Sequence, residues 1–283
     1  MGDISAYLRP ATLPEALNAL ASAERRVAAG CTDLLAATAA KTLPGPALDI
    51  TAIPELRAIE RSEEGLRLGA AVTWTQVARA NLPPALRGLQ QAARQVGALQ
   101  VQNRGTLGGN LCNASPAADG VPPLLTLDAQ VELRCAAGLR RLPLPAFLTG
   151  PRRTACRADE LLTAILIPAA ALGGEGAFLK LGARAHLVIS IAMTAARLRL
   201  KDGVVAEAAL AVGACGPVAV RLPQVEAALI GRAPDPARID DASVAAALSP
   251  IDDLRADAAF RARGAAELLR RTLAALTTET AAA

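Results

Sequence analysis

The sequence predicts a protein of mixed helices and strands that folds as two packed units. The chain has 283 residues, of which 52% are hydrophobic, so it is long for one core and rich enough in apolar residues for two. Strand, turn and helix patterns alternate up to residue 50, whereas short strands and hairpin turns dominate from Ile59 onward. The alanine- and glycine-rich segment 168–176 reads as a linker, and we place the domain boundary there.

The N-terminal region is expected to form one helix followed by a strand–turn–helix–turn–strand unit. Thr12 suits the N-cap of the first helix, and Pro14 suits its first turn. Gly30 directly follows the first strand, and Pro44-Gly45-Pro46 ends the second helix. The expected elements are helix 12–21, strand 26–29, helix 33–41 and strand 47–50.

The middle of the chain is expected to be richer in strands. A turn at 62–65 precedes an alternating strand, and Thr73 with Gln76 has the spacing of a capping box. Segment 100–127 contains no long periodic run and is rich in glycine and asparagine, which makes it a candidate binding loop. The expected elements are strand 66–70, a helix from 73 to about 81, helix 85–98, and strands 130–134 and 160–167.

The C-terminal region is expected to contain a β-hairpin and two helices. Lys201-Asp202-Gly203 lies between two apolar runs and has the composition of a hairpin turn. Gly231 suits the end of a helix, and the last long segment has apolar residues on one face and paired arginines on the other. The expected elements are strands 191–200 and 204–212 and helices 222–230 and 256–276.

Composition excludes several classes of function. The net charge is only +4, the arginines are scattered and aromatic residues are few, so we expect no nucleic-acid partner. The five cysteines include no close pair and there is one histidine, His186, so we expect no metal or iron–sulfur ligation within this chain. Neither a membrane span nor a signal sequence is recognisable, which predicts a cytoplasmic protein.

The first candidate site is the turn between the strand at 26–29 and the following predicted helix. Backbone N–H groups at such a turn converge on one point, where a diphosphate fits. Gly30 permits close approach, Thr32 can donate a hydroxyl hydrogen bond, and Asp33 suits the helix N-cap. A turn that merely connects two elements is the alternative. The residues are Ala28, Ala29, Gly30, Cys31, Thr32, Asp33, Leu34 and Leu35.

The second candidate site is the polar segment from Gln102 to Asp119. Two adjacent glycines can let the backbone lie flat against a ligand, and a carboxylate commonly pairs with ribose hydroxyls, so the set suits a nucleotide. A polar loop satisfied by its own backbone is the alternative. The segment offers Thr106, Gly108, Gly109, Asn110, Asn113, Ser115 and Asp119.

Hydrolytic chemistry has little support. A serine-based triad could use only His186, and no Gly-x-Ser-x-Gly elbow accompanies it. Paired carboxylates such as Glu63-Glu64 and Asp252-Asp253 are sequence neighbours in turns, which is typical of surface and helix-start charges. We therefore predict no catalytic acid or base for an organic substrate in this chain.

At the two loops the sequence resembles the FAD-binding (medium) subunit of the xanthine dehydrogenase and carbon monoxide dehydrogenase family of molybdenum hydroxylases. Ala29-Gly-Cys-Thr-Asp-Leu34 is similar to the family's first flavin loop, Ala-Gly-Gly-Thr-Asp-Leu. Arg104-Gly-Thr-Leu-Gly-Gly-Asn-Leu111 and Asn113-Ala-Ser-Pro-Ala-Ala-Asp119 resemble its second loop almost residue for residue. Further similar stretches, at 48–50, 53–56, 127–129, 147–151, 159–162, 167–168 and 178–184, extend the likeness over nearly the whole chain.

The resemblance implies an α+β fold and a site for noncovalently bound FAD. A PCMH-type FAD-binding domain would span residues 1–172, with subdomains of about 1–54 and 55–172, and a smaller C-terminal domain with an antiparallel sheet would span 173–283. The first loop would hold the diphosphate, and the second would surround diphosphate, ribose and adenine. Leu161 and Lys180 match positions beside the flavin ring, where an ammonium group can stabilise negative charge on reduced flavin.

Three departures from the family pattern stand out. Cys31 replaces the usual second glycine, so the loop must either do without a positive φ there or accept strain. Val188-Ile189 stands where the family commonly has aspartate followed by tyrosine or isoleucine near the ring. A cysteine-bearing insertion for an extra iron–sulfur cluster is missing, which argues against the hydroxybenzoyl-CoA reductase branch.

The resemblance also implies a role in electron transfer. A large subunit with the molybdenum cofactor would oxidise the substrate, and a small subunit with two [2Fe–2S] clusters would relay electrons to the FAD. The complex could be a dimer of heterotrimers, and the acceptor could be NAD, oxygen, a quinone or a carrier protein. The alternatives are a scaffold subunit without FAD and a free-standing flavoprotein oxidoreductase.

Overall fold

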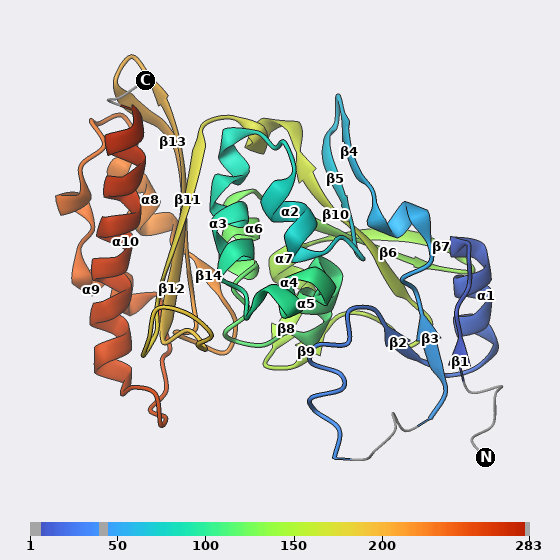
Figure 1. The fold of residues 1–283 in the computed structure, drawn as a ribbon. Helices are drawn as coiled ribbons and strands as arrows, with labels where there is room; N and C mark the ends of the chain where they lie inside the picture. Colours follow the sequence, from blue (N-terminus) through green and yellow to red (C-terminus); the bar gives the residue numbers. More distant parts are fainter. Residues whose placement is uncertain (1–6, 40–44, 281–283) are drawn as a thin grey trace.

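The computed structural model describes residues 7–39 and 45–280. Helices and three main sheets alternate along the chain (Figure 1), which confirms the expected α+β fold. The three sheets differ in topology, and each has its own cluster of buried apolar side chains.

The N-terminal sheet is parallel, with strand order β1-β3-β2. Helix α1 begins with the predicted cap: the Thr12 hydroxyl accepts the Glu15 N–H, and the Glu15 carboxylate accepts the Thr12 N–H. Its buried face consists of Leu13, Ala16 and Leu20. The elements are β1 (Tyr7–Leu8), α1 (Leu13–Ser22), β2 (Arg26–Ala28) and β3 (Ala47–Asp49).

The helix predicted at 33–41 is wrong in the described part of that range. Residues 33–37 form turns, and residues 40 and 41 lie outside the described residues. No side chain from 33 to 39 is buried, and Leu35 is 56% exposed. A short helix without a packed face is marginal in water, so local propensity is not enough here.

The second sheet is antiparallel, with strand order β4-β5-β10-β6-β7. Its core is built from apolar residues of the sheet and of the short helices that cover it. The segment 100–127, expected to lack regular structure, instead contains three short helices that begin at Leu99, Leu107 and Val121. The strands are β4 (Ile59–Ser62), β5 (Gly65–Gly69), β6 (Gln130–Cys135), β7 (Gly138–Pro143) and β10 (Leu161–Pro168).

The remaining elements of this region are short. The helices are η2 (Pro54–Arg57), α2 (Trp74–Arg79), η3 (Pro84–Leu86), α3 (Arg87–Gln95), α4 (Leu99–Arg104), α5 (Leu107–Asn113), α6 (Val121–Thr126), α7 (Leu144–Phe147) and η4 (Ala169–Leu172). A small two-stranded sheet joins β8 (Leu148–Gly150) to β9 (Arg153–Thr154).

The C-terminal sheet is antiparallel, with strand order β11-β12-β13-β14. The predicted hairpin is confirmed: Asp202 and Gly203 both have positive φ, 52° and 78°, as a tight hairpin turn requires. The strands are β11 (Glu175–Leu181), β12 (Ala192–Lys201), β13 (Val204–Gly213) and β14 (Val220–Arg221), and the helices are α8 (Pro223–Leu229), η5 (Pro236–Arg238), α9 (Asp241–Ala246) and α10 (Ala258–Thr280).

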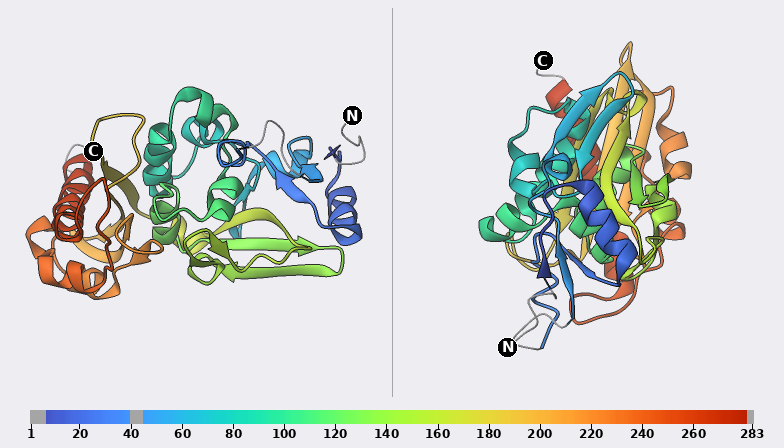
Figure 2. Two further views of the ribbon diagram at one scale, coloured as in Figure 1. Left: turned by 90° about the horizontal axis from the view of Figure 1, so that it is seen from below. Right: turned by 90° about the vertical axis from the view of Figure 1, so that its right-hand side faces the viewer.

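Helices α3 and α6 lie between the two antiparallel sheets, as Figures 1 and 2 show. Helix α10 covers the opposite face of the C-terminal sheet. The chain passes between the sheets after β3 and after β10, and the domain limits near 54 and 172 stay predictions. Within the described ranges no helix is long and apolar enough to cross a membrane.

Candidate functional site

The loop after β2 is pressed against the junction between α4 and α5. A Cβ atom added at Gly30 would lie 1.9 Å from the carbonyl oxygen of Arg104 and 2.8 Å from the Cα of Gly105. Only glycine therefore permits this approach. The two loops that the sequence analysis selected meet at this contact.

Cys31 adopts the strained conformation that the sequence analysis left as one of two possibilities. Its φ is 60°, in the left-handed region where a side chain costs about 1–2 kcal/mol. Burial raises the pKa of the Cys31 thiol, with a further increase from the Asp49 carboxylate. The thiol is therefore uncharged at neutral pH and does not repel an anion.

Backbone donors of the first loop point to an anion site. Among the described residues, the N–H groups of Cys31, Thr32, Asp33 and Leu34 have no hydrogen-bond partner. Consecutive free N–H groups in a turn that includes a left-handed residue form a concave donor surface. Such a surface fits a phosphate or diphosphate.

Helix α5 contributes shape rather than free donors. Leu107 and Gly108 donate their N–H groups to the carbonyls of Val72 and Ala70 at 2.9 and 2.8 Å, and Gly109 donates to the Thr106 hydroxyl at 3.0 Å. A Cβ at Gly108 would collide with Ala70, whereas one at Gly109 would meet only the Thr106 hydroxyl. Gly108 is thus needed for packing, and Gly109 leaves space beside the helix.

The polar side chains of the second loop differ in their bonding. Ser115 accepts the Ala117 N–H at 3.3 Å, and the Asn113 side chain accepts from Arg152, as a self-satisfied loop would. By contrast, the buried Oδ1 of Asn110 has no partner among the described residues. A buried polar atom without a partner is costly, which makes Asn110 a candidate ligand contact.

Asp119 and Lys180, predicted as separate ligand contacts, are bonded to each other. The Lys180 ammonium lies 2.7 Å from one Asp119 oxygen, and the Ser190 hydroxyl donates to the other at 2.6 Å. Lys180 also donates to the carbonyls of Gln95 and Val188 at 3.3 Å. The pair is buried and joins the second loop to the C-terminal sheet.

A partly open cavity of about 440 Å³ unites most of the predicted residues. The predicted residues on its wall are Ala29, Gly30, Cys31, Thr32, Asp33, Leu34, Thr106, Gly108, Gly109, Asn110, Asn113 and Leu161. Those outside its wall are Ala28, Leu35, Ser115, Asp119 and Lys180.

Sequence reasoning missed Arg25, which also lines the cavity. Its Nε donates to the Ala19 carbonyl at 3.3 Å, but its buried Nη1 has no partner among the described residues. Arg25, Val27 and Ala29 are alternate residues through β2 and the position on either side of it, and all three line the cavity. Strand alternation from Ala29 could have indicated Arg25 beforehand.

Another part of the cavity wall, which includes Cys156, Arg157 and Glu160, is held by an ion pair. Arg140 donates to both oxygens of Glu160 at 2.6 and 2.7 Å and to the Ala155 carbonyl at 2.7 Å. The hydrogen bond from Arg140 holds the pKa of the Glu160 carboxyl below its ordinary value. Burial raises the pKa of the Cys156 thiol to about 11.

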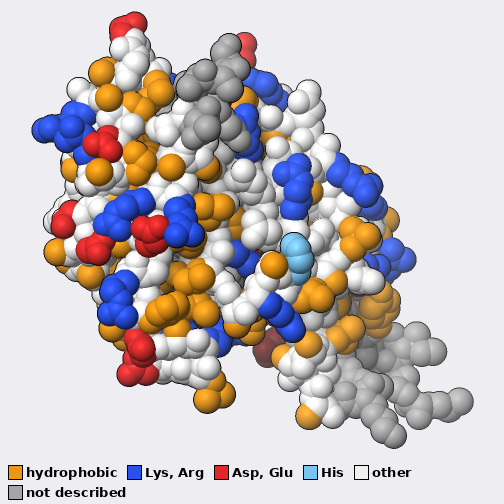
Figure 3. All heavy atoms as spheres, turned by 60° about the vertical axis from the view of Figure 1, so that its left-hand side comes forward, with side chains coloured by type: hydrophobic (Ala, Val, Ile, Leu, Met, Phe, Trp, Pro, Cys, Tyr) orange, Lys and Arg blue, Asp and Glu red, His pale blue; other side chains and the backbone are white. Residues whose placement is uncertain are grey.

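His186 is exposed, and it is the pale blue side chain in Figure 3. On that face basic side chains are scattered among acidic and apolar ones. In the described part of the chain no group of His, Cys, Asp or Glu is arranged to hold a metal ion. The cavity is therefore the candidate site that the geometry supports.

Two family models match the sequence. Residues 3–170 match the FAD binding domain in molybdopterin dehydrogenase, and residues 177–276 match the CO dehydrogenase flavoprotein C-terminal domain. Together they cover most of the chain.

Relatives and solved structures agree with these matches. The chain is 35% identical to the xanthine dehydrogenase FAD-binding subunit of Escherichia coli O157:H7, over 80% of this chain and 79% of that one. It is 31% identical to the nicotine 6-hydroxylase medium subunit of Paenarthrobacter nicotinovorans, over 94% and 95%. A structure of carbon monoxide dehydrogenase from Hydrogenophaga pseudoflava superimposes with a TM-score of 0.88, at 28% identity and 96% coverage of both chains.

Proposed function

The chain belongs to the family of FAD-binding subunits of molybdenum hydroxylases, and from this we propose that it passes electrons from a partner's iron–sulfur clusters to an external acceptor. As an FAD-binding medium subunit it is an oxidoreductase component. The electron-transfer role and the partners are the parts of this statement that we propose.

One observation supports the proposed cofactor site above others: the four free N–H groups of the first loop, residues 31–34, on the wall of the cavity. The FAD diphosphate would accept hydrogen bonds from these groups, which have no partner in the described chain. Gly30 brings them against the second loop, and Gly109 leaves room for the ligand. The residues present therefore fit a dinucleotide.

The remaining wall offers groups for the other parts of FAD. Asn110 Oδ1 and Arg25 Nη1 are buried polar atoms without a partner in the described ranges, and each would gain one from the ligand. Leu161 contributes an apolar side chain to the wall. Asp119 and Lys180 stay proposed contacts of the ligand. Because they are bonded to each other, each would have to bind the ligand in addition to its present partner.

Bound FAD would supply the exchange of single electrons for electron pairs. This chain would bind and orient it: the uncharged Cys31 thiol would not repel the diphosphate, and the Glu160 carboxylate is paired with Arg140. No residue of the cavity is needed as an acid or base for an organic substrate. We propose that substrate oxidation takes place in a large molybdenum-cofactor subunit and that a small [2Fe–2S] subunit relays the electrons.

The test is electron flow through the assembled complex. The chain is co-expressed with its neighbouring genes, purified by a tag on this chain, and divided into FAD-containing and FAD-depleted samples. After dithionite reduction, reoxidation of the iron–sulfur clusters is followed with NAD, oxygen or a quinone as acceptor. We expect at least one acceptor to work rapidly only with FAD present, and readdition of FAD to restore it. Equal rates in both samples would contradict the role, and a complex that never contains FAD would indicate a scaffold subunit.

A further inference from the structure

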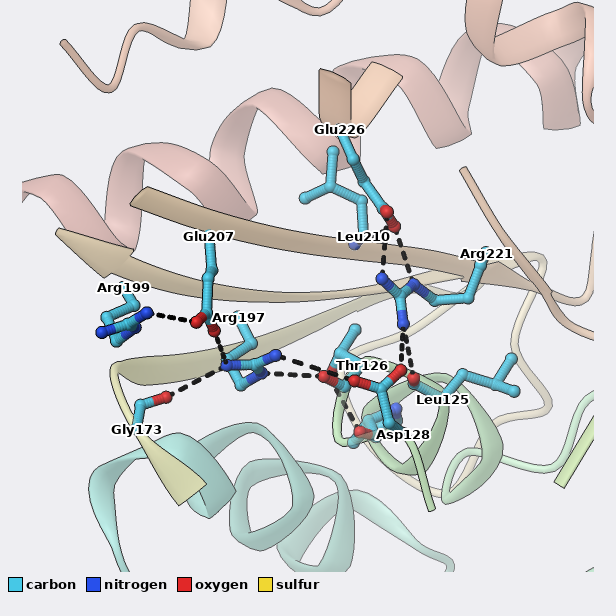
Figure 4. Close-up of polar contacts among 11 residues, drawn as sticks. Leu125, Thr126, Asp128, Gly173, Arg197, Arg199, Glu207, Leu210, Arg221 and Glu226 are labelled. Atoms are coloured by element: carbon cyan, nitrogen blue, oxygen red, sulfur yellow. Dashed lines mark hydrogen bonds and ion pairs between the residues drawn. The ribbon is translucent and has the colours of Figure 1, made fainter. Parts of the chain in front are cut away.

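Arg221 of the C-terminal sheet holds the C-terminal end of helix α6 (Figure 4). Its Nη1 donates to the Leu125 carbonyl at 3.0 Å and to the Asp128 carboxylate at 2.8 Å. The last carbonyls of a helix lack partners within the helix and carry partial negative charge. The Leu125 carbonyl already accepts the Asp128 N–H at 3.2 Å, so the guanidinium group adds a second hydrogen bond and complements the partial negative charge of this end.

Arg197 holds the same end from strand β12, which β13 separates from the strand of Arg221 (Figure 4). Its Nε donates to the Thr126 carbonyl at 2.9 Å, and its Nη1 donates to the Gly173 carbonyl at 3.2 Å and to Glu207 at 3.1 Å. Only 6% of its side chain is exposed. Two arginines from one sheet thus bind two successive carbonyls of α6.

The sheet keeps Arg221 in position. Glu226 of α8 accepts from the guanidinium at 2.7 and 2.9 Å, and it also accepts the Leu210 N–H at 2.8 Å. Glu226 is thereby anchored to strand β13. Because Glu226 fixes the orientation of the Arg221 guanidinium relative to the sheet, a displacement of the sheet would also displace α6.

The other end of α6 touches the wall of the cavity. Gly120 precedes the helix, and a Cβ there would lie 2.5 Å from the ring of Trp74 and 2.9 Å from Asn110 Oδ1. Trp74 and Asn110 both line the cavity. All six residues of α6 are buried, and prolines at 122 and 123 restrict its backbone. A displacement at one end of this short, stiff helix therefore reaches the other.

We infer that Arg197 and Arg221 are positioning residues for the cofactor cavity, acting through α6 on Gly120, Asn110 and Trp74. The inference rests on the proposed function, because the cavity is taken as the FAD site. Neither arginine lines the cavity, so the C-terminal sheet would affect ligand binding indirectly, through the position of α6.

The test compares Arg221→Met with Arg270→Met in the full chain. Arg270 is a matched control: its side chain is 29% exposed against 24% for Arg221, and it donates to the Ile239 carbonyl and pairs with Asp241. It makes these contacts within the C-terminal region, away from α6. FAD is titrated into flavin-depleted protein well below both unfolding midpoints. Emission and acrylamide quenching of Trp74, the one tryptophan of the chain, are recorded without FAD.

Loss of the Arg221 contacts should weaken FAD binding by about 3- to 30-fold and increase quenching of Trp74, which is 2% exposed. Arg270→Met should lower the unfolding midpoint but leave both readouts unchanged. Arg221→Lys should restore part of the affinity. If Arg221→Met does not fold, Asp128→Asn removes the negative charge that faces Arg221 while keeping an acceptor oxygen, and it is judged by the same readouts.

Equal FAD affinity and equal Trp74 quenching in the two methionine variants would refute the inference. If the wild-type chain itself fails to bind FAD, the proposed function is wrong. The quenching comparison would then still decide whether the arginines position the cavity wall.

Discussion

The substitution Gly30→Ala is expected to weaken FAD binding strongly while the protein stays folded. The new Cβ would lie 1.9 Å from the Arg104 carbonyl oxygen, and a contact of 3.0 Å needs 1.1 Å more (3.0 minus 1.9). The position of the Cβ is fixed by the backbone of residue 30 and the oxygen belongs to the backbone of Arg104, so no side-chain rotation relieves the collision. The first loop must move away from α5, and its free N–H groups move with it.

The size of the effect follows from the donors that are displaced. A hydrogen bond from an N–H group to a charged acceptor contributes about 1.5–3 kcal/mol. If the shift misaligns two of the four free donors at residues 31–34, the loss is at least about 3 kcal/mol, or roughly a 100-fold increase in Kd. None of residues 29–34 is fully buried, so the shift disturbs little core packing, and the free energy of unfolding should change by only about 1–3 kcal/mol.

Titration of FAD into the flavin-depleted chain measures this directly, with thermal unfolding as a check of folding. Gly138→Ala is the matched control, because a Cβ at that position meets nothing within 4 Å. The control should bind FAD like the wild type. A Gly30→Ala variant with a Kd within about threefold of the wild type would refute the assigned role of the first loop.

Three other outcomes follow from the cavity. Cys31→Gly removes a left-handed penalty of about 1–2 kcal/mol and adds about 0.5–1 kcal/mol of chain entropy, so its unfolding midpoint should rise slightly with FAD binding retained; a lower midpoint contradicts the strain. Arg25→Met should weaken FAD binding by about tenfold without loss of stability, because a buried unpaired nitrogen disappears; unchanged affinity argues against a ligand contact. Arg140 lowers the pKa of Glu160, so their pair stabilises the fold above the ordinary glutamate pKa of 4.5, and this contribution is lost as pH falls from there through the folded-state pKa. Arg140→Met should make the free energy of unfolding less dependent on pH in that window. An unchanged pH dependence of the unfolding free energy would show that the pair contributes little.

Features set by neighbouring residues could be predicted from the sequence. The N-cap at Thr12 and the capping box of Thr73 and Gln76 depend on residues within one turn, and the hairpin at Asp202-Gly203 depends on two residues that tolerate positive φ. The flavin loops were selected because their glycines and polar residues are contiguous in sequence. Each of these signals is complete within a few residues.

Features set by long-range packing could not be predicted. Asp119 and Lys180 are 61 residues apart, and nothing local indicates that they pair. The helix predicted at 33–41 does not form over its described residues, 33–39, because no side chain there is buried. The segment around Leu107 became helical because the Thr106 hydroxyl caps it and neighbouring carbonyls accept its first N–H groups.

Flavin content tests the central claim most directly. The chain is purified by its tag with its co-expressed partners, and the visible spectrum is recorded before and after acid precipitation. The account predicts flavin absorbance in the complex and, after precipitation, FAD in the supernatant at one molecule per chain, with iron and molybdenum in the same chromatographic peak. A stable complex that contains both metals but no flavin would contradict it.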